Sequence, residues 1–245
     1  ATLAAKAVTT GYLSQNRPDD GGTPPEGVES PESGPRPFVL TCLGGGSDGG
    51  SLAAIAVEAE PPDGHRHLIV TGPQMDAEEF DELRERAGAA TTVIRHNDDI
   101  PGLVASAEAV VCMGGYNTLA ELMATDTPAL VVPRKGHRAE QPRRAFALAA
   151  AGAVDAHTID SLDADALSEW FAGRAGCPND RSHIDLTGLA TVPRLAAELV
   201  AAARVEAQAL VPEAAPTAAN RPTAPRGTAT SARLPITLEE TSHAV

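Results

Sequence analysis

The sequence is short of aromatic residues and of basic side chains, and each shortage limits what the protein can be. Phe, Trp and Tyr make up 3% of the 245 residues, so Ala, Leu, Val and Ile must form most of any core. Lys and Arg number 19 against 33 Asp and Glu, which gives a formal net charge of -14. Nucleic acids and anionic membrane surfaces attract basic patches, so this balance argues against both as partners. No apolar run approaches the roughly 20 residues of a membrane span, and we expect no transmembrane segment.

Cysteine is scarce as well. The three cysteines, Cys42, Cys112 and Cys177, show no CxxC spacing, and their number is odd. Without an export signal in the first residues, this pattern is typical of reduced thiols, and we expect a cytoplasmic protein. The seven histidines are scattered without metal-ligand spacing, so we expect no metal and no other cofactor.

The composition changes along the chain and predicts its organisation. Residues 14–37 are rich in Pro, Gly and acidic side chains and have almost nothing to bury, which is typical of a linker. Apolar runs and helical patterns alternate over residues 38–205. Ala, Pro and Thr dominate residues 206–245, and we expect a disordered tail there.

Five continuous apolar runs alternate with helical stretches between residues 38 and 205. The runs that predict strands are 38–43, 67–72, 91–95, 109–113 and 128–134. The stretches that predict helices are 51–59, 76–88, 99–107, 140–151 and 163–173, together with one that opens near 116. Such alternation indicates a parallel sheet covered by helices on both faces, a Rossmann-like α/β domain.

A first glycine loop follows the first predicted strand. Gly44, Gly46 and Gly49 satisfy G-x-G-x-x-G, a pattern that lets bare backbone approach a phosphate at a helix N-terminus. The pattern alone is weak evidence, because a sharp turn that needs a positive φ has the same glycines. A nicotinamide enzyme also needs an acid at the end of the second strand. The first acid there, Asp76, comes several residues late.

A second glycine loop lies at residues 114–118, where the run 109–113 turns into a helix. Gly114 and Gly115 would let the backbone come close to a ligand, and the N–H groups of Asn117 and Thr118 would point at an anion. Glu121, one turn later, is placed to accept both hydroxyls of a ribose. The spacing of Thr118 and Glu121 equally fits a capping box, in which Glu121 bonds only a backbone donor.

A third candidate element follows the run 128–134. Arg134 ends that run, and we expect it to contact a phosphate. His137 comes next, and Glu140 and Gln141 enter a helix, where an amide and a carboxylate suit the vicinal hydroxyls of a sugar. The basic residues of this stretch form a cluster in an otherwise acidic chain: Arg134, Arg138, Arg143 and Arg144.

The segments LGGGSDGG, MGGYNTLAE and PALVVPRKGHRAEQPRRA, in this order and at these spacings, resemble the C-terminal donor-binding domain of glycosyltransferase family 28. The resemblance covers residues 38–200. It points to the branch of predicted glycosyltransferases, which is related to the lipid-intermediate N-acetylglucosaminyltransferase of peptidoglycan synthesis. It implies the C-terminal half of a GT-B enzyme, with two Rossmann-like domains and a nucleotide-diphosphate sugar, most commonly a UDP-sugar, between them.

The resemblance also implies roles for individual residues. The donor phosphates would lie against both glycine loops, and the ribose would lie on Glu121. The donor sugar would contact His137, Glu140 and Gln141, and the base would lie near Arg95, His96 and Ile100. The phosphate contacts implied are Gly45, Gly46, Ser47, Gly114, Gly115, Asn117 and Thr118.

The implied reaction is direct displacement at the anomeric carbon by an acceptor hydroxyl, with a general base and no metal. In the family that base comes from the N-terminal domain, so the catalytic residues remain unknown here. Residues 7–13, AVTTGYL, are similar to the strand that closes that domain, and we expect residues 1–13 to be a remnant of the domain. We therefore expect this chain to bind a donor but to need an N-terminal acceptor-binding half, in cis or as a separate subunit. A nucleotide-sugar 2-epimerase and a non-catalytic nucleotide-sugar-binding module are the alternatives.

Overall fold

The computed structural model describes residues 7–14, 36–135 and 139–209. These residues fall into two units that divide between Leu199 and Val200. Most of the linker predicted over 14–37 falls outside the described ranges, as do His137 and residues 210–245 of the predicted tail. No helix among the described residues is long and apolar enough to cross a lipid bilayer.

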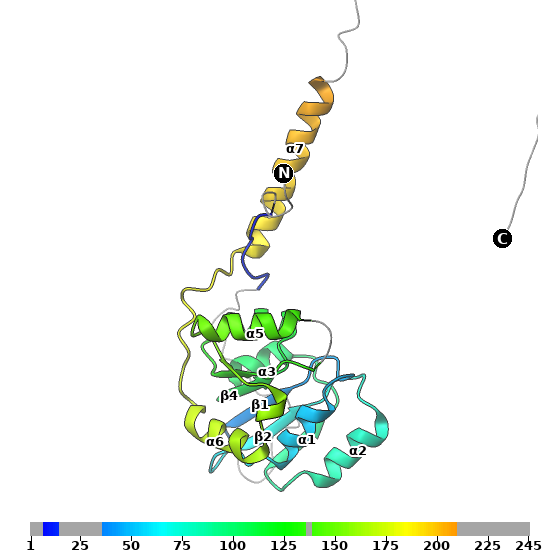
Figure 1. Cartoon of the computed structure of the whole chain (residues 1–245), viewed down its shortest axis with the longest axis vertical. Helices are drawn as coiled ribbons and strands as arrows, with labels where there is room; N and C mark the ends of the chain where they lie inside the picture. The colour runs from blue at the N-terminus through cyan, green and yellow to red at the C-terminus, as the bar shows by residue number, and fades with distance from the viewer. Residues whose placement is uncertain (1–6, 15–35, 136–138, 210–245) are drawn as a thin grey trace, which may run out of the picture. The chain divides into compact units, whose positions relative to one another are not determined.

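One sheet of six parallel strands organises the first unit (Figure 1). Its order is β3-β2-β1-β4-β5-β6, so β1 lies inside the sheet between β2 and β4. Every residue of β1 and of β4 is buried, which is the pattern of parallel strands covered on both faces. The strands are β1 (Phe38–Cys42), β2 (Arg66–Val70), β3 (Thr91–Ile94), β4 (Ala109–Cys112), β5 (Ala129–Val131) and β6 (Asp155–Ala156).

Alternate strand residues point to opposite faces and produce two apolar cores. Val39 belongs to the core on one face and Leu40 to the core on the other. Helices α1 (Gly50–Glu58), α2 (Ala77–Arg86) and α6 (Ala164–Arg174) cover the first face. Helices α3 (Ile100–Ser106), α4 (Tyr116–Met123) and α5 (Glu140–Ala150) cover the second face. The predicted parallel sheet with helices on both faces is therefore confirmed, and the five apolar runs form β1 to β5.

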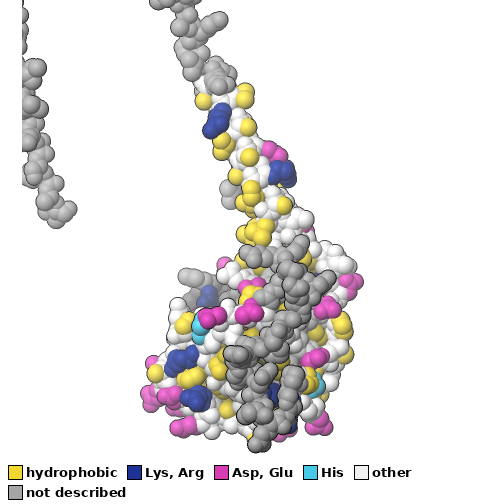
Figure 2. Space-filling view, turned by 180° about the vertical axis from the view of Figure 1, so that it is seen from behind, with side chains coloured by type: hydrophobic (Ala, Val, Ile, Leu, Met, Phe, Trp, Pro, Cys, Tyr) yellow, Lys and Arg dark blue, Asp and Glu magenta, His cyan; other side chains and the backbone are white. Residues whose placement is uncertain are grey.

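Three elements differ from the expectation. The short strand β6 and the 3-10 helix Ile159–Ser161 were not predicted, and β6 is only two half-buried residues long. Helix α7 (Gly188–Ala209) was not predicted either, and it crosses the boundary placed at 205–206. Its alanine-rich sequence favours a helix, but it exposes Leu189, Val192 and Leu199 instead of burying one face. Figure 2 shows hydrophobic side chains along this helix and acidic side chains scattered over the first unit.

A histidine on β2, the strand that pairs with β1, is buried in the core. The side chain of His67 on β2 is fully buried, and its Nε2 lies 2.8 Å from Oγ1 of Thr41. The edge of its ring meets Phe171 of α6, with 5.1 Å between the ring centroids. Burial disfavours the charged imidazolium and lowers the pKa of His67 from 6.5 to about 4.

We predict that His67 makes the protein less stable in mild acid. The unfolded chain binds a proton near pH 6.5 and the folded protein only near pH 4, so the free energy of unfolding falls as the pH drops between these values. The shift corresponds to a loss of about 3 kcal/mol. Urea unfolding between pH 7 and 4.5 should show a shallower pH dependence in His67→Gln than in wild type. The control is His183→Gln, a change at an exposed position. This variant should show the same pH dependence of the free energy of unfolding as the wild type. Equal slopes for all three proteins would contradict the prediction.

Candidate functional site

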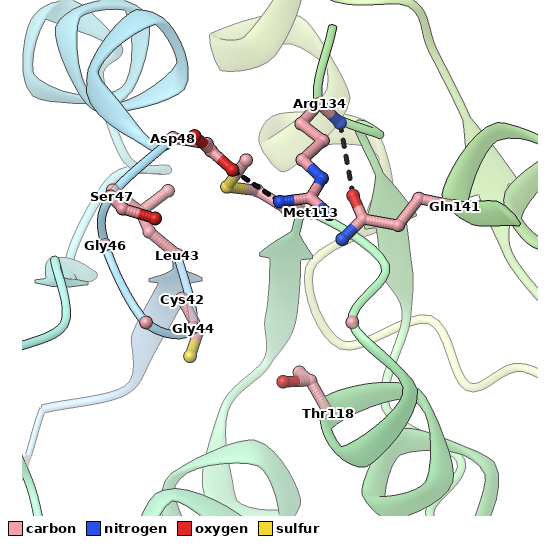
Figure 3. Close-up of a pocket in the computed structure, with 12 residues that line it drawn as sticks. Cys42, Leu43, Gly44, Gly46, Ser47, Asp48, Met113, Thr118, Arg134 and Gln141 are labelled. Atoms are coloured by element: carbon pink, nitrogen blue, oxygen red, sulfur yellow. Dashed lines mark hydrogen bonds and ion pairs between the residues drawn. The ribbon is translucent and has the colours of Figure 1, made fainter. Parts of the chain in front are cut away.

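The candidate site lies at the carboxyl edge of the sheet, where its strand order reverses. From β1 the chain proceeds outward through β2 and β3, and then returns to β4 on the other side of β1. Such a switch point leaves a crevice between the two neighbouring strands. A cavity of about 210 Å³ occupies it, and we call it the β1–β4 pocket (Figure 3). Its lining residues are Cys42, Leu43, Gly44, Gly45, Gly46, Ser47, Asp48, Met113, Gly115, Thr118, Arg134 and Gln141.

Two helices begin at this pocket without a side-chain cap. Gly49 is the N-cap of α1 and Gly115 that of α4, and neither helix has an acidic residue in its first turn. The first intrahelical bonds run from Ala53 N–H to the Gly49 carbonyl and from Leu119 N–H to the Gly115 carbonyl, at 2.9 and 3.0 Å. The amides before them have no partner within their helix and carry the positive end of its dipole. Both ends favour an anion.

Three other helices at this edge have an aspartate cap, whereas α5, whose N-cap is Ala139, has no side-chain cap. The side chains of Asp76, Asp99 and Asp163 accept bonds from the first-turn N–H groups of α2, α3 and α6, at 2.8 to 2.9 Å. Asp76, the acid that a nicotinamide enzyme would have needed, therefore serves as a cap. At the corresponding positions of α1 and α4, glycine provides no such side-chain acceptor for the first-turn amides.

Glu121 does not form the capping box that its spacing allowed. Gly115 is the N-cap of α4, so Thr118 lies inside the helix and is not its cap. Glu121 is half-buried one turn further on. Burial raises the pKa of the Cys42 thiol, and the negative charge of Glu121 adds to this shift. The carboxylate therefore lies near Cys42, which lines the pocket.

Glycine is present at different positions around the pocket for different physical reasons. Gly46 has a φ of 94°, and a Cβ there would lie 2.6 Å from the Thr71 carbonyl oxygen. Gly114 has a φ of 77°, and a Cβ there would lie 2.9 Å from Cγ1 of Val131. Gly115 has an ordinary φ of -58°, and a Cβ there would meet no atom within 4 Å. The fold thus requires glycine at the first two positions, whereas at Gly115 it only leaves free space on the pocket wall.

Arg134 reaches over the pocket from the end of β5. Its guanidinium forms an ion pair with Asp48 of the first glycine loop, and the two side chains point toward each other across the opening in Figure 3. Its backbone N–H donates to Oε1 of the buried Gln141, at 3.4 Å. The sequence did not predict the pair with Asp48, because the two residues are 86 positions apart and no local pattern links them.

Seven of the predicted site residues line the pocket, and others lie beside it. The lining residues are Gly45, Gly46, Ser47, Gly115, Thr118, Arg134 and Gln141. Gly114 and Asn117 flank the start of α4, and the exposed Glu140 opens α5 without reaching the pocket wall. The role assigned to His137 cannot be placed, since it lies outside the described residues.

The three residues expected near the base lie after β3, two strands away from β1. The guanidinium of Arg95 donates to the Met75 carbonyl at 2.8 Å and lies 4.1 Å from the centre of the Phe80 ring. His96 lies 2.9 Å from a carboxylate oxygen of Asp98, and Ile100 packs against the core. None of the three lines the pocket, and their contact with a base remains a prediction.

A family model matches more than half of the chain. The model described as the glycosyltransferase family 28 C-terminal domain matches residues 40–170. This range begins in β1 and ends in α6, so it includes both glycine loops and all the residues that line the pocket.

Curated relatives show the same relationship over part of their length. The chain is 31% identical over 144 residues to the UDP-N-acetylglucosamine--N-acetylmuramyl-(pentapeptide) pyrophosphoryl-undecaprenol N-acetylglucosamine transferase of Burkholderia thailandensis, covering 52% of this chain and 38% of the relative. It is 25% identical over 107 residues to an uncharacterized glycosyltransferase of Methanosarcina mazei, covering 43% and 27%. The matches therefore span less than two fifths of these relatives.

Among solved structures, the calicheamicin glycosyltransferase CalG4 superposes with a TM-score of 0.52 at 19% identity. The superposition covers 72% of this chain and 46% of CalG4. At this identity the match shows a shared fold and no more.

We predict that Asp48→Asn increases the affinity of the pocket for pyrophosphate. The change removes a negative charge from the opening and releases Arg134 from its ion pair. Over a few ångströms near a protein surface, one charge should change the Kd by about threefold to tenfold. Calorimetric titration at low salt measures it, and the gain should shrink at high salt because exposed charges are screened. Asp81→Asn changes the net charge equally on the exposed side of α2 and should leave the Kd unaltered. Weaker binding by Asp48→Asn would mean that Asp48 instead holds Arg134 in the binding position.

Proposed function

This chain belongs to the glycosyltransferase family 28 C-terminal domain family, and we propose that the β1–β4 pocket binds the diphosphate of a nucleotide-sugar donor. The observation that carries the proposal is the convergence of two uncapped helix N-termini on one pocket. Their free amides and dipoles favour a multiply charged anion, and the bare Gly115 leaves it room to approach.

The size of the pocket supports a diphosphate and argues against a whole nucleotide sugar inside it. A cavity of about 210 Å³ is smaller than the roughly 300 to 1,000 Å³ typical of complete small-molecule sites. The nucleoside and the sugar would therefore extend beyond it. In this arrangement Glu121 would hold the ribose, and Gln141 at the start of α5 would contact the sugar.

Uridine is the first base to test. The names of the Burkholderia thailandensis relative and of a second relative, from Opitutus terrae, include UDP-N-acetylglucosamine. We propose a UDP-sugar as the donor on this ground and leave the sugar open.

In the proposed reaction the acceptor hydroxyl attacks the anomeric carbon of the bound donor, and the bond to the diphosphate breaks. Negative charge then grows on the leaving diphosphate, where the amides of α1 and α4 and the guanidinium of Arg134 would stabilise it. We propose that the acceptor site and the general base belong to an N-terminal half, in cis or as a separate subunit. The pocket described here would provide the donor side of the reaction.

Gly115→Val tests the proposal directly. Because a Cβ at this position meets no atom within 4 Å, the substitution should fold, with about 1 kcal/mol lost at the helix cap. The valine side chain would project from the pocket wall and exclude the diphosphate. Calorimetric titration with UDP, TDP, GDP and ADP should show binding of at least one of them to the wild type, and at least tenfold weaker binding to the variant.

Gly88→Val is the matched control. Gly88 also has free space around its Cβ and lies in the turn before β3, at the opposite edge of the sheet. It should bind the nucleotide as the wild type does. If no nucleoside diphosphate binds the wild type, or if Gly115→Val binds normally, the pocket is not a donor site.

For Glu121 we predict a loss that depends on the ribose hydroxyls. Glu121→Gln should weaken UDP binding by about 1–3 kcal/mol, the range of hydrogen bonds to a charged group. It should weaken 2'-deoxy-UDP binding much less, since that ligand lacks one of the hydroxyls. Comparing both ligands on both proteins gives a double-mutant cycle, and equal losses for the two ligands would exclude the ribose contact.

A further inference from the structure

The N-terminal segment Ala7–Ser14 lies against the same unit as the pocket. The backbone N–H of Tyr12 donates to the Asp185 carbonyl at 2.8 Å, and the N–H of Gly188 donates to the Tyr12 carbonyl at 3.2 Å. Tyr12 also packs against the core that α3, α4 and α5 form with the sheet. Backbone bonds on both sides of one residue fix this part of the segment in place.

Tyr12 contacts the first residue of helix α4. Its ring stacks on the ring of Tyr116, with 5.8 Å between the centroids and 13° between the planes. The next residue strengthens the contact, since the N–H of Leu13 donates to the hydroxyl oxygen of Tyr116 at 3.0 Å. The segment therefore holds the side chain that opens the helix whose N-cap is Gly115.

Arg144 of α5 connects this aromatic pair to the glycine loop. Its guanidinium carbon lies 5.6 Å from the centre of the Tyr116 ring, within the range of a cation–π contact. The same guanidinium donates to the carbonyl oxygen of Gly114 at 3.1 Å. Tyr12, Tyr116, Arg144 and Gly114 thus form one chain of contacts that ends beside the pocket.

The last contact determines where an amide points. The carbonyl of Gly114 and the N–H of Gly115 belong to the same planar trans peptide, so they point in opposite directions. Because Arg144 holds the carbonyl oxygen of Gly114, it also fixes the direction of the Gly115 N–H, the first amide at the pocket-facing end of α4. At Gly114, where φ is 77°, a glycine backbone could otherwise rotate easily.

We propose that Tyr12 is a positioning residue for the anion-binding amides of α4, acting through Tyr116 and Arg144. Segment Ala7–Ser14 is then a working part of the donor site and not a spacer before it. The inference rests on the proposed function for the identity of the ligand. Its effect is reciprocal, because a ligand that binds better when the segment is docked must also favour docking of the segment.

The test compares Tyr12→Ala and Tyr12→Phe with the wild type in calorimetric titrations with UDP. Tyr12→Ala removes the stacked ring and should raise the Kd by about threefold to tenfold, the scale of an aromatic pair. Tyr12→Phe keeps the stack and should bind as the wild type does. Val8→Ala changes an exposed side chain of the same segment and is the control.

Hydrogen exchange supplies a readout that a purely structural role would not change. Saturating UDP should slow exchange of the Leu13 amide in the wild type and in Tyr12→Phe. It should not slow exchange in Gly115→Val, which cannot bind the nucleotide. Unchanged affinity in Tyr12→Ala, or no protection of Leu13 in a wild type that binds UDP, overturns the coupling but leaves the donor site intact. If no nucleoside diphosphate binds the wild type, both the coupling and the proposed donor site are excluded.

Discussion

Strand β4 hydrogen-bonds to β1 instead of extending the sheet beyond β3, and this pairing brings the two glycine loops of the pocket together. The register places Cys42 opposite Cys112, so the two strands end at the same level. The loops that leave them are therefore neighbours, although about 70 residues separate them in the sequence. Helices α1 and α4 begin where these loops end. Both helix N-termini therefore lie at the same edge of the sheet, beside the pocket.

Helices α1 and α4 lack a local stabilisation that α2, α3 and α6 have, and α5 lacks it as well. A side-chain cap contributes about 1 kcal/mol to a helix, and α2, α3 and α6 each obtain it from an aspartate. In α1 and α4 glycine takes that position, so their first amides are left to water or to a ligand. Asp48, which lines the pocket, is paired with Arg134. The pocket is thus slightly unfavourable for the folded chain and suited to an anion, as expected of a binding site that trades some stability for function.

The sequence predicted the elements of this fold better than their contacts. Continuous apolar runs gave β1 to β5, because strands buried on both faces leave little room for polar residues. The strand β6 is too short and too exposed to leave such a signal. The two glycine loops could also be recognised in the sequence. Spacing alone could not show that Gly46 packs against backbone whereas Gly115 has free space around it. The contacts of Asp48 with Arg134 and of Leu13 with Tyr116 join residues 86 and 103 positions apart, and no periodic pattern carries such information.

The three thiols differ in a way that has a practical consequence. Cys42 and Cys112 are buried at the ends of β1 and β4, and burial raises the pKa of Cys112 to about 12, so almost none of it is thiolate at neutral pH. Cys177 is exposed after α6, beside Gly176, whose N–H donates to the carbonyl of Glu108 just before β4. That bond places it at the amino edge of the sheet, opposite the pocket. A maleimide dye would therefore attach at one known position, on the edge of the sheet opposite the β1–β4 pocket.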